Sequence, residues 1–225
     1  MPVPTRQEYF VRWADLHGGY DPSSSRMVGP WLTFVYALAR PFAALRVPPD
    51  VVTVLGGIVS ALAIWPAASG GHWPIVAFAV VVVSGIVDNL DGAVAVLTDR
   101  TTRWGFVLDS VVDRVSDGCY LVALWAAGAP VGVCVVGGAL MGLQEYARAR
   151  ANAAGMSEVG VVTVWERPTR VIVTAMFLLG AGIYVSAAAD WARWGAWAWV
   201  GLGVVGLVQL LVVVRRRLTA PDAPA

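Results

Sequence analysis

The chain has 225 residues, of which 58% are hydrophobic and only 14% are charged. Soluble domains are about half apolar and about a quarter charged, so the composition favours an integral membrane protein, whose lipid-facing residues are apolar as well. The formal net charge of +1 gives no reason to expect a nucleic-acid partner. The N-terminal residues lack an apolar core, so no signal peptide is predicted. Cys119 and Cys134 lie in apolar segments and are expected to be packing residues.

The apolar segments, taken in chain order, predict the membrane topology. Residues 1–30 are expected to form a cytoplasmic N-terminal segment. The stretch 31–46 is short and is interrupted by Arg40 and Pro41, so we interpret it as an amphipathic helix in the membrane interface. The fold class predicted is all-α integral membrane, with one catalytic domain of six transmembrane helices at 47–217 and a cytoplasmic tail at 218–225. The six apolar runs lie at 51–70, 74–97, 105–127, 131–150, 169–187 and 194–214.

The arginines are distributed unevenly over this map. With the N-terminus in the cytoplasm, nearly all of them fall on the cytoplasmic side, and the opposite side holds only Arg193. Cytoplasmic loops of membrane proteins carry such an excess of basic residues. We therefore expect a multi-pass protein of the cell membrane with both ends in the cytoplasm.

Six aspartates lie between residues 88 and 117. Asp88 and Asp91 are three residues apart near the end of the second predicted span, and Asp109 and Asp113 are four apart near the start of the third. Residues at these spacings share a helix face, so two antiparallel helices joined by a short loop bring four carboxylates together below the cytoplasmic surface. An ion at the centre of a membrane helix costs about 2.5–3.5 kcal/mol, a cost that divalent cations offset. The spacing predicts two hard cations, Mg²⁺ or Mn²⁺, of the kind used in phosphoryl transfer.

Residues next to the four aspartates extend this prediction. Asp117 lies one turn beyond the last of them and either pairs with Arg114 or reaches the substrate. Gly92 and Gly105 stand beside the aspartates, where glycine costs a helix roughly 0.5–1 kcal/mol relative to alanine. We interpret both glycines as allowing the close approach of a ligand rather than of another helix.

This segment resembles the signature of the CDP-alcohol phosphotransferase (CDP-alcohol phosphatidyltransferase) family. The matching residues are Asp88-x-x-Asp91-Gly92-x-x-Ala95 and Gly105-x-x-x-Asp109-x-x-x-Asp113. The resemblance implies that the four aspartates hold two metal ions and that the substrate is a CDP-linked lipid, usually CDP-diacylglycerol. It also implies that Asp113 is the general base on the attacking alcohol, that CMP leaves, that the site faces the cytoplasm, and that the protein is a homodimer.

The resemblance extends to the nucleotide site. Thr53 and Thr102 match polar positions of the family, although simple helix capping explains both equally well. Val96 stands where the family has an arginine that helps hold the nucleotide phosphates. We expect the missing charge to come from Arg100, which shares the helix face if the helix continues, or from Arg103. The implied nucleotide-binding residues are Asp50, Thr53, Gly92, Ala95, Arg100, Thr102, Arg103 and Gly105.

Candidates for binding the acceptor lie near the ends of the fourth and fifth predicted spans. Arg148, Arg150 and Arg170 could bind a phosphate, because guanidinium groups bind phosphate in a bidentate way; the alternative is that they only set the topology. The segments Asp113-Arg114-x-x-Asp117-Gly118 and Tyr-Ala-Arg-Ala-Arg-Ala look most like phosphatidylinositol phosphate synthases of actinobacteria. The resemblance implies inositol phosphate as acceptor, with glycerol phosphate next.

Two other functional classes stay open on the sequence alone. Carboxylates inside membrane spans line the ion path of some transporters and channels, but here all four gather near one surface. A catalytically weak or non-catalytic relative that acts as a membrane scaffold is the second alternative, and Val96 is its only support.

Overall fold

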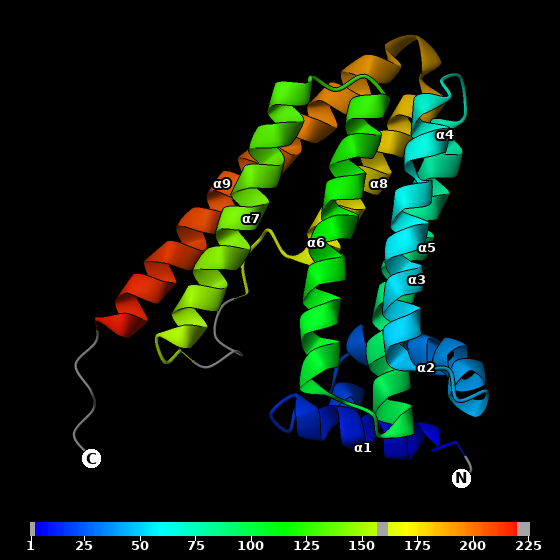
Figure 1. Cartoon of the computed structure of the whole chain (residues 1–225), viewed down its shortest axis with the longest axis vertical. Coiled ribbons are helices and arrows are strands. Elements are labelled where there is room, and N and C mark those ends of the chain that lie inside the picture. Colours follow the sequence, from blue (N-terminus) through cyan, green and yellow to red (C-terminus); the bar gives the residue numbers. More distant parts are fainter. Residues whose placement is uncertain (1–2, 157–161, 220–225) are drawn as a thin grey trace. The chain divides into compact units, whose positions relative to one another are not determined.

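The computed structural model describes residues 3–156 and 162–219, and within these residues the chain forms helices and no strands (Figure 1). The chain divides into two compact units. Unit 1 comprises Met1–Val59 and Val83–Ser116, and unit 2 comprises Ser60–Val82 and Asp117–Ala225. The predicted tail at 218–225 lies outside the described residues from position 220 onward.

Unit 1 begins with a helix that the sequence reading did not anticipate. Residues 1–30 were expected to be only a cytoplasmic segment, but α1 spans Arg6–Leu16. It starts with a capping box, in which Thr5 accepts a hydrogen bond from the backbone of Glu8 and the Glu8 carboxylate accepts one from the backbone of Thr5. Tyr9 is buried, with its ring centroid 5.6 Å from that of Tyr36. Figure 1 shows α1 lying crosswise to the end of α5 (Pro74–Thr98).

The second helix, α2 (Val28–Ala44), runs through Pro41 without interruption. Pro41 lies in the last turn, where the loss of one donor removes little of the helix's hydrogen bonding. Leu32, Val35, Ala39 and Ala43 form a buried stripe at helical spacing, and packing of this stripe sustains the helix. The interfacial position of α2 stays a prediction.

The first three predicted spans coincide with observed helices within a few residues. The first divides into α3 (Pro49–Leu62) and α4 (Ile64–Ala68), because Pro66 has no N–H to donate to the carbonyl four residues earlier. The second is α5, and the third is α6 (Arg103–Ala126). α3, α5 and α6 each contribute residues to both units.

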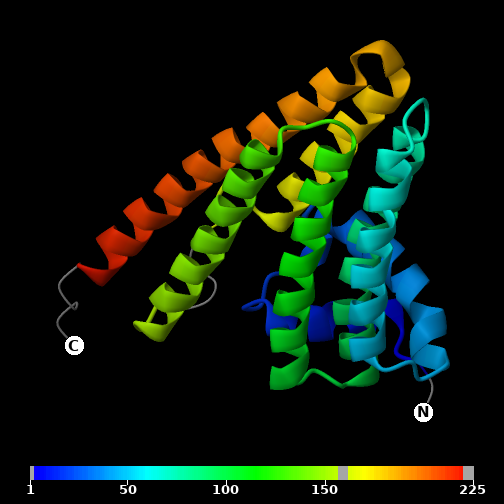
Figure 2. The same ribbon diagram turned by 45° about the horizontal axis from the view of Figure 1, so that its top comes forward.

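The remaining helices belong to unit 2. They are α7 (Val131–Ala153), α8 (Arg167–Ile183) and α9 (Ala188–Leu218), and α7 and α9 lie side by side in both views (Figure 2). Small residues on α9 permit close packing: a Cβ on Gly206 would lie 2.5 Å from the Cβ of the buried Trp165. Trp165 in turn packs edge-on against Trp199, with ring centroids 5.0 Å apart.

Three helical segments of the described chain are long and apolar enough to cross a membrane, namely Pro49–Ala68, Pro74–Thr98 and Val185–Leu218. α6 and α7 carry charged side chains within their length, and α8 has only 17 residues. Helices therefore lie at the six predicted positions, while the prediction that all six cross the membrane stays a prediction.

Candidate active site

Three of the four motif aspartates form one acidic cluster. Asp88 lies on α5, whereas Asp109 and Asp113 lie one turn apart on α6. Each side chain is half-buried and offers a carboxylate oxygen, and these oxygens all lie within 4.8 Å of one another. Carboxylates this close repel one another, so a cation among them is stabilising. Because the donors are oxygen atoms only, the cluster is suited to a hard divalent cation such as Mg²⁺ or Mn²⁺.

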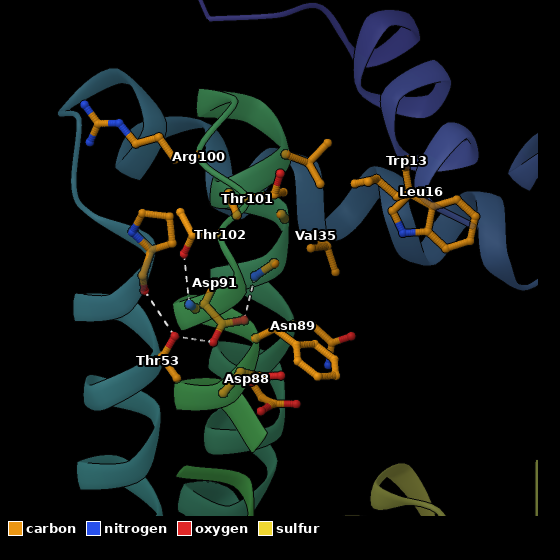
Figure 3. Close-up of a pocket in the computed structure, with 18 of the residues that line it drawn as sticks. Trp13, Leu16, Val35, Thr53, Asp88, Asn89, Asp91, Arg100, Thr101 and Thr102 are labelled. Carbon is orange, nitrogen blue, oxygen red and sulfur yellow. Dashed lines mark hydrogen bonds between the residues drawn. The ribbon is translucent and has the colours of Figure 1, made fainter. Parts of the chain in front are cut away.

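The fourth aspartate, Asp91, is held by α3. Thr53 Oγ1 donates a 2.6 Å hydrogen bond to Asp91 Oδ2, and the backbone N–H of Gly92 donates to Asp91 Oδ1 at 2.5 Å (Figure 3). Asp91 is 7% exposed and interacts electrostatically with Asp88 and Asp109. These bonds fix its carboxylate beside the acidic cluster.

A cavity of about 440 Å³ opens beside these carboxylates, entirely within unit 1. Its lining includes Asp88, Asp91 and Asp109. Among the described residues, only Arg103 of the predicted nucleotide-binding set is not in the lining. The members of that set that line the cavity are Asp50, Thr53, Gly92, Ala95, Arg100, Thr102 and Gly105.

The two glycines of the motif, Gly92 and Gly105, have different structural surroundings. A Cβ on Gly92 would meet no atom of the described residues within 4 Å, so helix packing does not require this glycine and its effect is to widen the cavity. A Cβ on Gly105 would lie 3.1 Å from Thr102 Oγ1 and 3.6 Å from Asp50 Oδ1. Thr102 Oγ1 accepts a 2.9 Å hydrogen bond from the Gly105 N–H, which makes Thr102 a cap of α6 as well as a lining residue.

The loop between α5 and α6 corrects one expectation. Arg100 was expected to share the face of Val96 if the helix continued, but α5 ends at Thr98. Asp99 has a φ of 54° and reverses the chain there, so that the Arg100 N–H donates to Ala95 O at 2.9 Å. Arg100 therefore lines the cavity from the loop and not from the helix face, and in Figure 3 its side chain extends away from Asp91.

Helix α1 forms a wall of the cavity that sequence reasoning missed. Tyr9, Trp13, Leu16 and His17 line it, together with Leu32 and Val35 of α2. Arg12 Nη1 donates a 3.2 Å hydrogen bond to Val96 O, which ties α1 to the last turns of α5. The Thr5-x-x-Glu8 capping box was the one signal in the sequence that could have revealed this helix.

Two of the three predicted acceptor-binding arginines lie in a buried ion network of unit 2. Arg170 is fully buried; its Nη1 lies 2.7 Å from Asp117 Oδ2 and its Nη2 lies 2.7 Å from Glu145 Oε1. Arg148 Nη2 lies 2.8 Å from Glu166 Oε1, and Arg148 also pairs with Glu145. Asp117 thus bonds to Arg170, a partner that the sequence did not suggest.

The third of these arginines and the carboxylate of Glu166 lie in different environments. Arg150 is exposed on the last turn of α7. Glu166 precedes α8, and although burial alone would raise its pKa, hydrogen bonds from Thr163 and Arg148 outweigh burial and hold the pKa below its ordinary value. The carboxylate of Glu166 is therefore charged at neutral pH.

Comparisons with known proteins agree with this arrangement. A model of the CDP-alcohol phosphatidyltransferase family matches residues 46–205. A phosphatidylinositol phosphate synthase of Mycolicibacterium smegmatis is 36% identical over 204 residues, which cover 83% of this chain and 86% of the relative. One from Streptomyces avermitilis is 30% identical over 213 residues, 84% of this chain and 83% of the relative.

Solved structures of one relative have the same fold. The crystal structure of Mycobacterium tuberculosis phosphatidylinositol phosphate synthase with CDP-DAG bound has a TM-score of 0.68 at 27% identity and covers 84% of this chain and 98% of that chain. The same synthase in complex with manganese and citrate also gives a TM-score of 0.68. The family match covers more than half of the chain and includes the whole acidic cluster. The chain therefore belongs to the CDP-alcohol phosphatidyltransferase family and is a metal-binding membrane transferase of phospholipid biosynthesis.

Proposed function

We propose that the protein transfers the phosphatidyl group of CDP-diacylglycerol to a hydroxyl of inositol phosphate and releases CMP, with glycerol phosphate as the second candidate acceptor. The observation that carries the proposal is the acidic cluster of Asp88, Asp109 and Asp113 at a cavity lined by the rest of the motif. The relatives named phosphatidylinositol phosphate synthase support the choice of acceptor.

The metal site in this proposal consists of Asp88, Asp91, Asp109 and Asp113, which hold two divalent ions, Mg²⁺ or Mn²⁺. The oxygen-only donors and their mutual proximity support it, as does the manganese complex of the solved relative. When bound, the ions neutralise the charge of the diphosphate that the reaction divides. Thr53 supports the site by orienting the Asp91 carboxylate through its 2.6 Å hydrogen bond.

Asp113 is the general base of the proposed reaction. An oxygen of the acceptor hydroxyl forms a bond to the phosphorus that carries the diacylglycerol, and the bond from that phosphorus to the CMP oxygen breaks. The hydroxyl proton passes to Asp113, and CMP leaves with the bonding electron pair. Arg114 Nη2 lies 3.4 Å from Asp113 Oδ2, and this ion pair helps to hold the carboxylate in place.

The CDP moiety binds in the cavity of unit 1. Asp50, Thr53, Gly92, Ala95, Thr102 and Gly105 surround it, and Arg100 supplies positive charge from the loop. Arg103 remains a second candidate for this charge, because it opens α6 beside the same loop.

The arginines proposed to bind the acceptor phosphate are Arg148, Arg150 and Arg170. Arg150 is exposed, which supports a direct contact. Arg148 and Arg170 already pair with Glu145, so a phosphate that binds them exchanges one anionic partner for another.

The topology that suits this function has six membrane spans, α2 in the interface, the acidic cluster facing the cytoplasm of a multi-pass cell-membrane protein, and two copies in a homodimer. Soluble inositol phosphate would then reach the site from the cytoplasm, while CDP-diacylglycerol enters from the bilayer. The three long apolar helical segments support the membrane location.

One experiment tests the function directly. Purified protein is incubated with CDP-diacylglycerol, Mn²⁺ or Mg²⁺, and either inositol phosphate, glycerol phosphate or inositol, and both CMP and the lipid product are measured. We expect CMP release to require the metal and to be fastest with inositol phosphate. If release is fastest with glycerol phosphate, glycerol phosphate and not inositol phosphate is the acceptor. If no acceptor leads to CMP release, the proposal is contradicted. Asp88→Asn serves as the inactive control.

A further inference from the structure

The wall of the cavity contributed by α1 carries an aromatic pair that the reaction as described does not use. The rings of Trp13 and His17 are stacked, with centroids 3.8 Å apart and planes inclined by 12°. His17 Nδ1 lies 2.7 Å from Trp13 O, which fixes the imidazole at the end of α1. Tyr20 contacts the Trp13 ring edge-on, with centroids 6.4 Å apart. Together these residues form a rigid surface of conjugated rings.

The aromatic pair and the carboxylates line one cavity. Trp13 and His17 contribute to its lining together with Asp88, Asp91 and Asp109. In Figure 3, Trp13 lies on the α1 side of the pocket and Asp91 on the α3–α5 side. A volume of about 440 Å³ falls within the roughly 300–1,000 Å³ of small-molecule sites. A ligand that fills the cavity needs an anionic end for a carboxylate-bound cation and a flat, weakly polar end for the rings.

Helix α1 has a fixed position in unit 1, so the ring pair is preorganised. Tyr9, one turn before Trp13, is 1% exposed and packs against Tyr36 of α2. Arg12 donates its hydrogen bond to Val96 O on α5. Preorganised groups lose little conformational entropy when a ligand binds, which increases what each contact contributes to affinity.

The nucleotide of CDP-diacylglycerol has the two ends that the cavity requires, a diphosphate and a cytosine ring. We propose that Trp13 and His17 form a stacking platform for that cytosine, so that the N-terminal helix recognises the base. The inference rests on the proposed function for the identity of the nucleotide. Aromatic side chains bind bases by stacking in many nucleic-acid sites. Loss of the platform is expected to weaken CMP binding about tenfold.

Anchoring of α1 in the membrane interface is the competing role for the half-buried Trp13. A lipid-free nucleotide distinguishes the two roles, since CMP has no acyl chain and binds from water. A platform affects the affinity for CMP and the KM for CDP-diacylglycerol alike. An anchor affects only the KM for CDP-diacylglycerol and leaves the affinity for CMP unchanged.

The test measures CMP binding to the purified full-length protein by calorimetry in Mn²⁺, and kcat and KM for CDP-diacylglycerol. Trp13→Leu is expected to weaken CMP about tenfold and to raise KM by a similar factor, with kcat nearly unchanged. Trp13→Phe keeps a ring and should recover most of the affinity, and His17→Ala should weaken CMP less than Trp13→Leu does. Trp31→Leu is the matched control, because Trp31 is 41% exposed on α2 and is not among the described residues that line the cavity.

Wild-type CMP affinity in Trp13→Leu and His17→Ala would overturn the platform while leaving the proposed function intact. Equal losses in Trp13→Leu and Trp13→Phe would also overturn it, because the ring would then not matter. If Trp13→Leu fails to fold, His17→Ala decides, since its side chain is exposed at the end of α1. If the wild-type protein binds CMP but never releases it from CDP-diacylglycerol, the proposed function fails and the base platform stands.

Discussion

The acidic cluster of unit 1 and the ion network of unit 2 balance their charges in opposite ways. In the network, the fully buried Arg170 lies 2.7 Å from a carboxylate oxygen of both Asp117 and Glu145. In the cluster, three carboxylates lie within 4.8 Å of one another. Opposite charges at hydrogen-bond distance attract and link helices, whereas the like charges of the cluster repel one another until a bound cation relieves the repulsion. The comparison separates a structural use of charge from a functional one.

The two arrangements should therefore respond differently to the loss of one charge. Neutralising a carboxylate of the cluster removes repulsion, so the fold should tolerate the change while the chemistry should not. Removing Arg170 from the network leaves the fully buried Asp117 and the half-buried Glu145 without their shared partner, so the fold should lose stability.

The largest effect is expected for Asp113→Asn, which removes a ligand of the metal site and the proposed base. CMP release should fall by at least about 10²–10⁴-fold, the range for loss of a general base, while the melting temperature in the absence of metal should stay the same or rise. Asp99→Asn is the matched control, because Asp99 is exposed in the loop at a φ of 54°, a conformation that asparagine also tolerates. If Asp113→Asn retains activity, Asp113 is not the general base.

The next largest effect is expected for Arg170→Met. Breaking a buried ion pair by removing one partner costs about 3–5 kcal/mol, so unfolding in detergent should occur at a clearly lower denaturant concentration. Arg193→Met is the control, since Arg193 and Asp190 form an exposed pair at 3.1 Å, and such a pair contributes less than about 1 kcal/mol. Equal stability of the two variants would mean that the network does not hold unit 2 together.

The features that the sequence predicted well depend on local periodicity. The apolar runs located α5, α6 and α7 within a few residues. The spacing of Asp109 and Asp113 placed them on one helix face, and the short loop placed Asp88 near them. Helical periodicity and short connections depend on residues that are close together in the chain, so these features could be predicted from the sequence.

The features that were missed depend on contacts between residues far apart in the chain. Arg12 meets the Val96 carbonyl across 84 positions, and Arg170 meets Asp117 across 53. The apolar run ended at 97, within one residue of the end of α5, but the chain reversal that follows was not foreseen, because it uses Asp99 at positive φ, where glycine is the usual signal. The metal, nucleotide and acceptor roles of the named residues stay predictions, because a fold alone does not assign a ligand.

A smaller effect is expected for Thr53→Val, which sharpens the comparison within unit 1. Valine keeps the shape of threonine but removes the 2.6 Å hydrogen bond to Asp91. Groups that orient metal ligands typically contribute 10- to 100-fold to metal affinity, so the Mn²⁺ concentration for half-maximal CMP release should rise about tenfold. Thr33→Val is the control, because Thr33 bonds only to Gly29 O of its own helix among the described residues. An unchanged metal requirement would assign Thr53 to capping alone.

The smallest effect is a pH dependence of stability that comes from Glu166 of the network. The pKa of Glu166 is lowered in the folded state, because hydrogen bonds from Thr163 and Arg148 outweigh the opposing effect of burial. A carboxyl group of this kind stabilises the fold above its unfolded pKa of about 4.3 and loses that contribution as the pH falls through the folded value. The melting temperature of the wild type should therefore fall on acidification below about pH 4, and Glu166→Gln should show a shallower fall. Asp190→Asn, at an exposed position, should follow the wild type. A slope that stays unchanged in Glu166→Gln would mean that Glu166 does not contribute to the acid sensitivity of the fold.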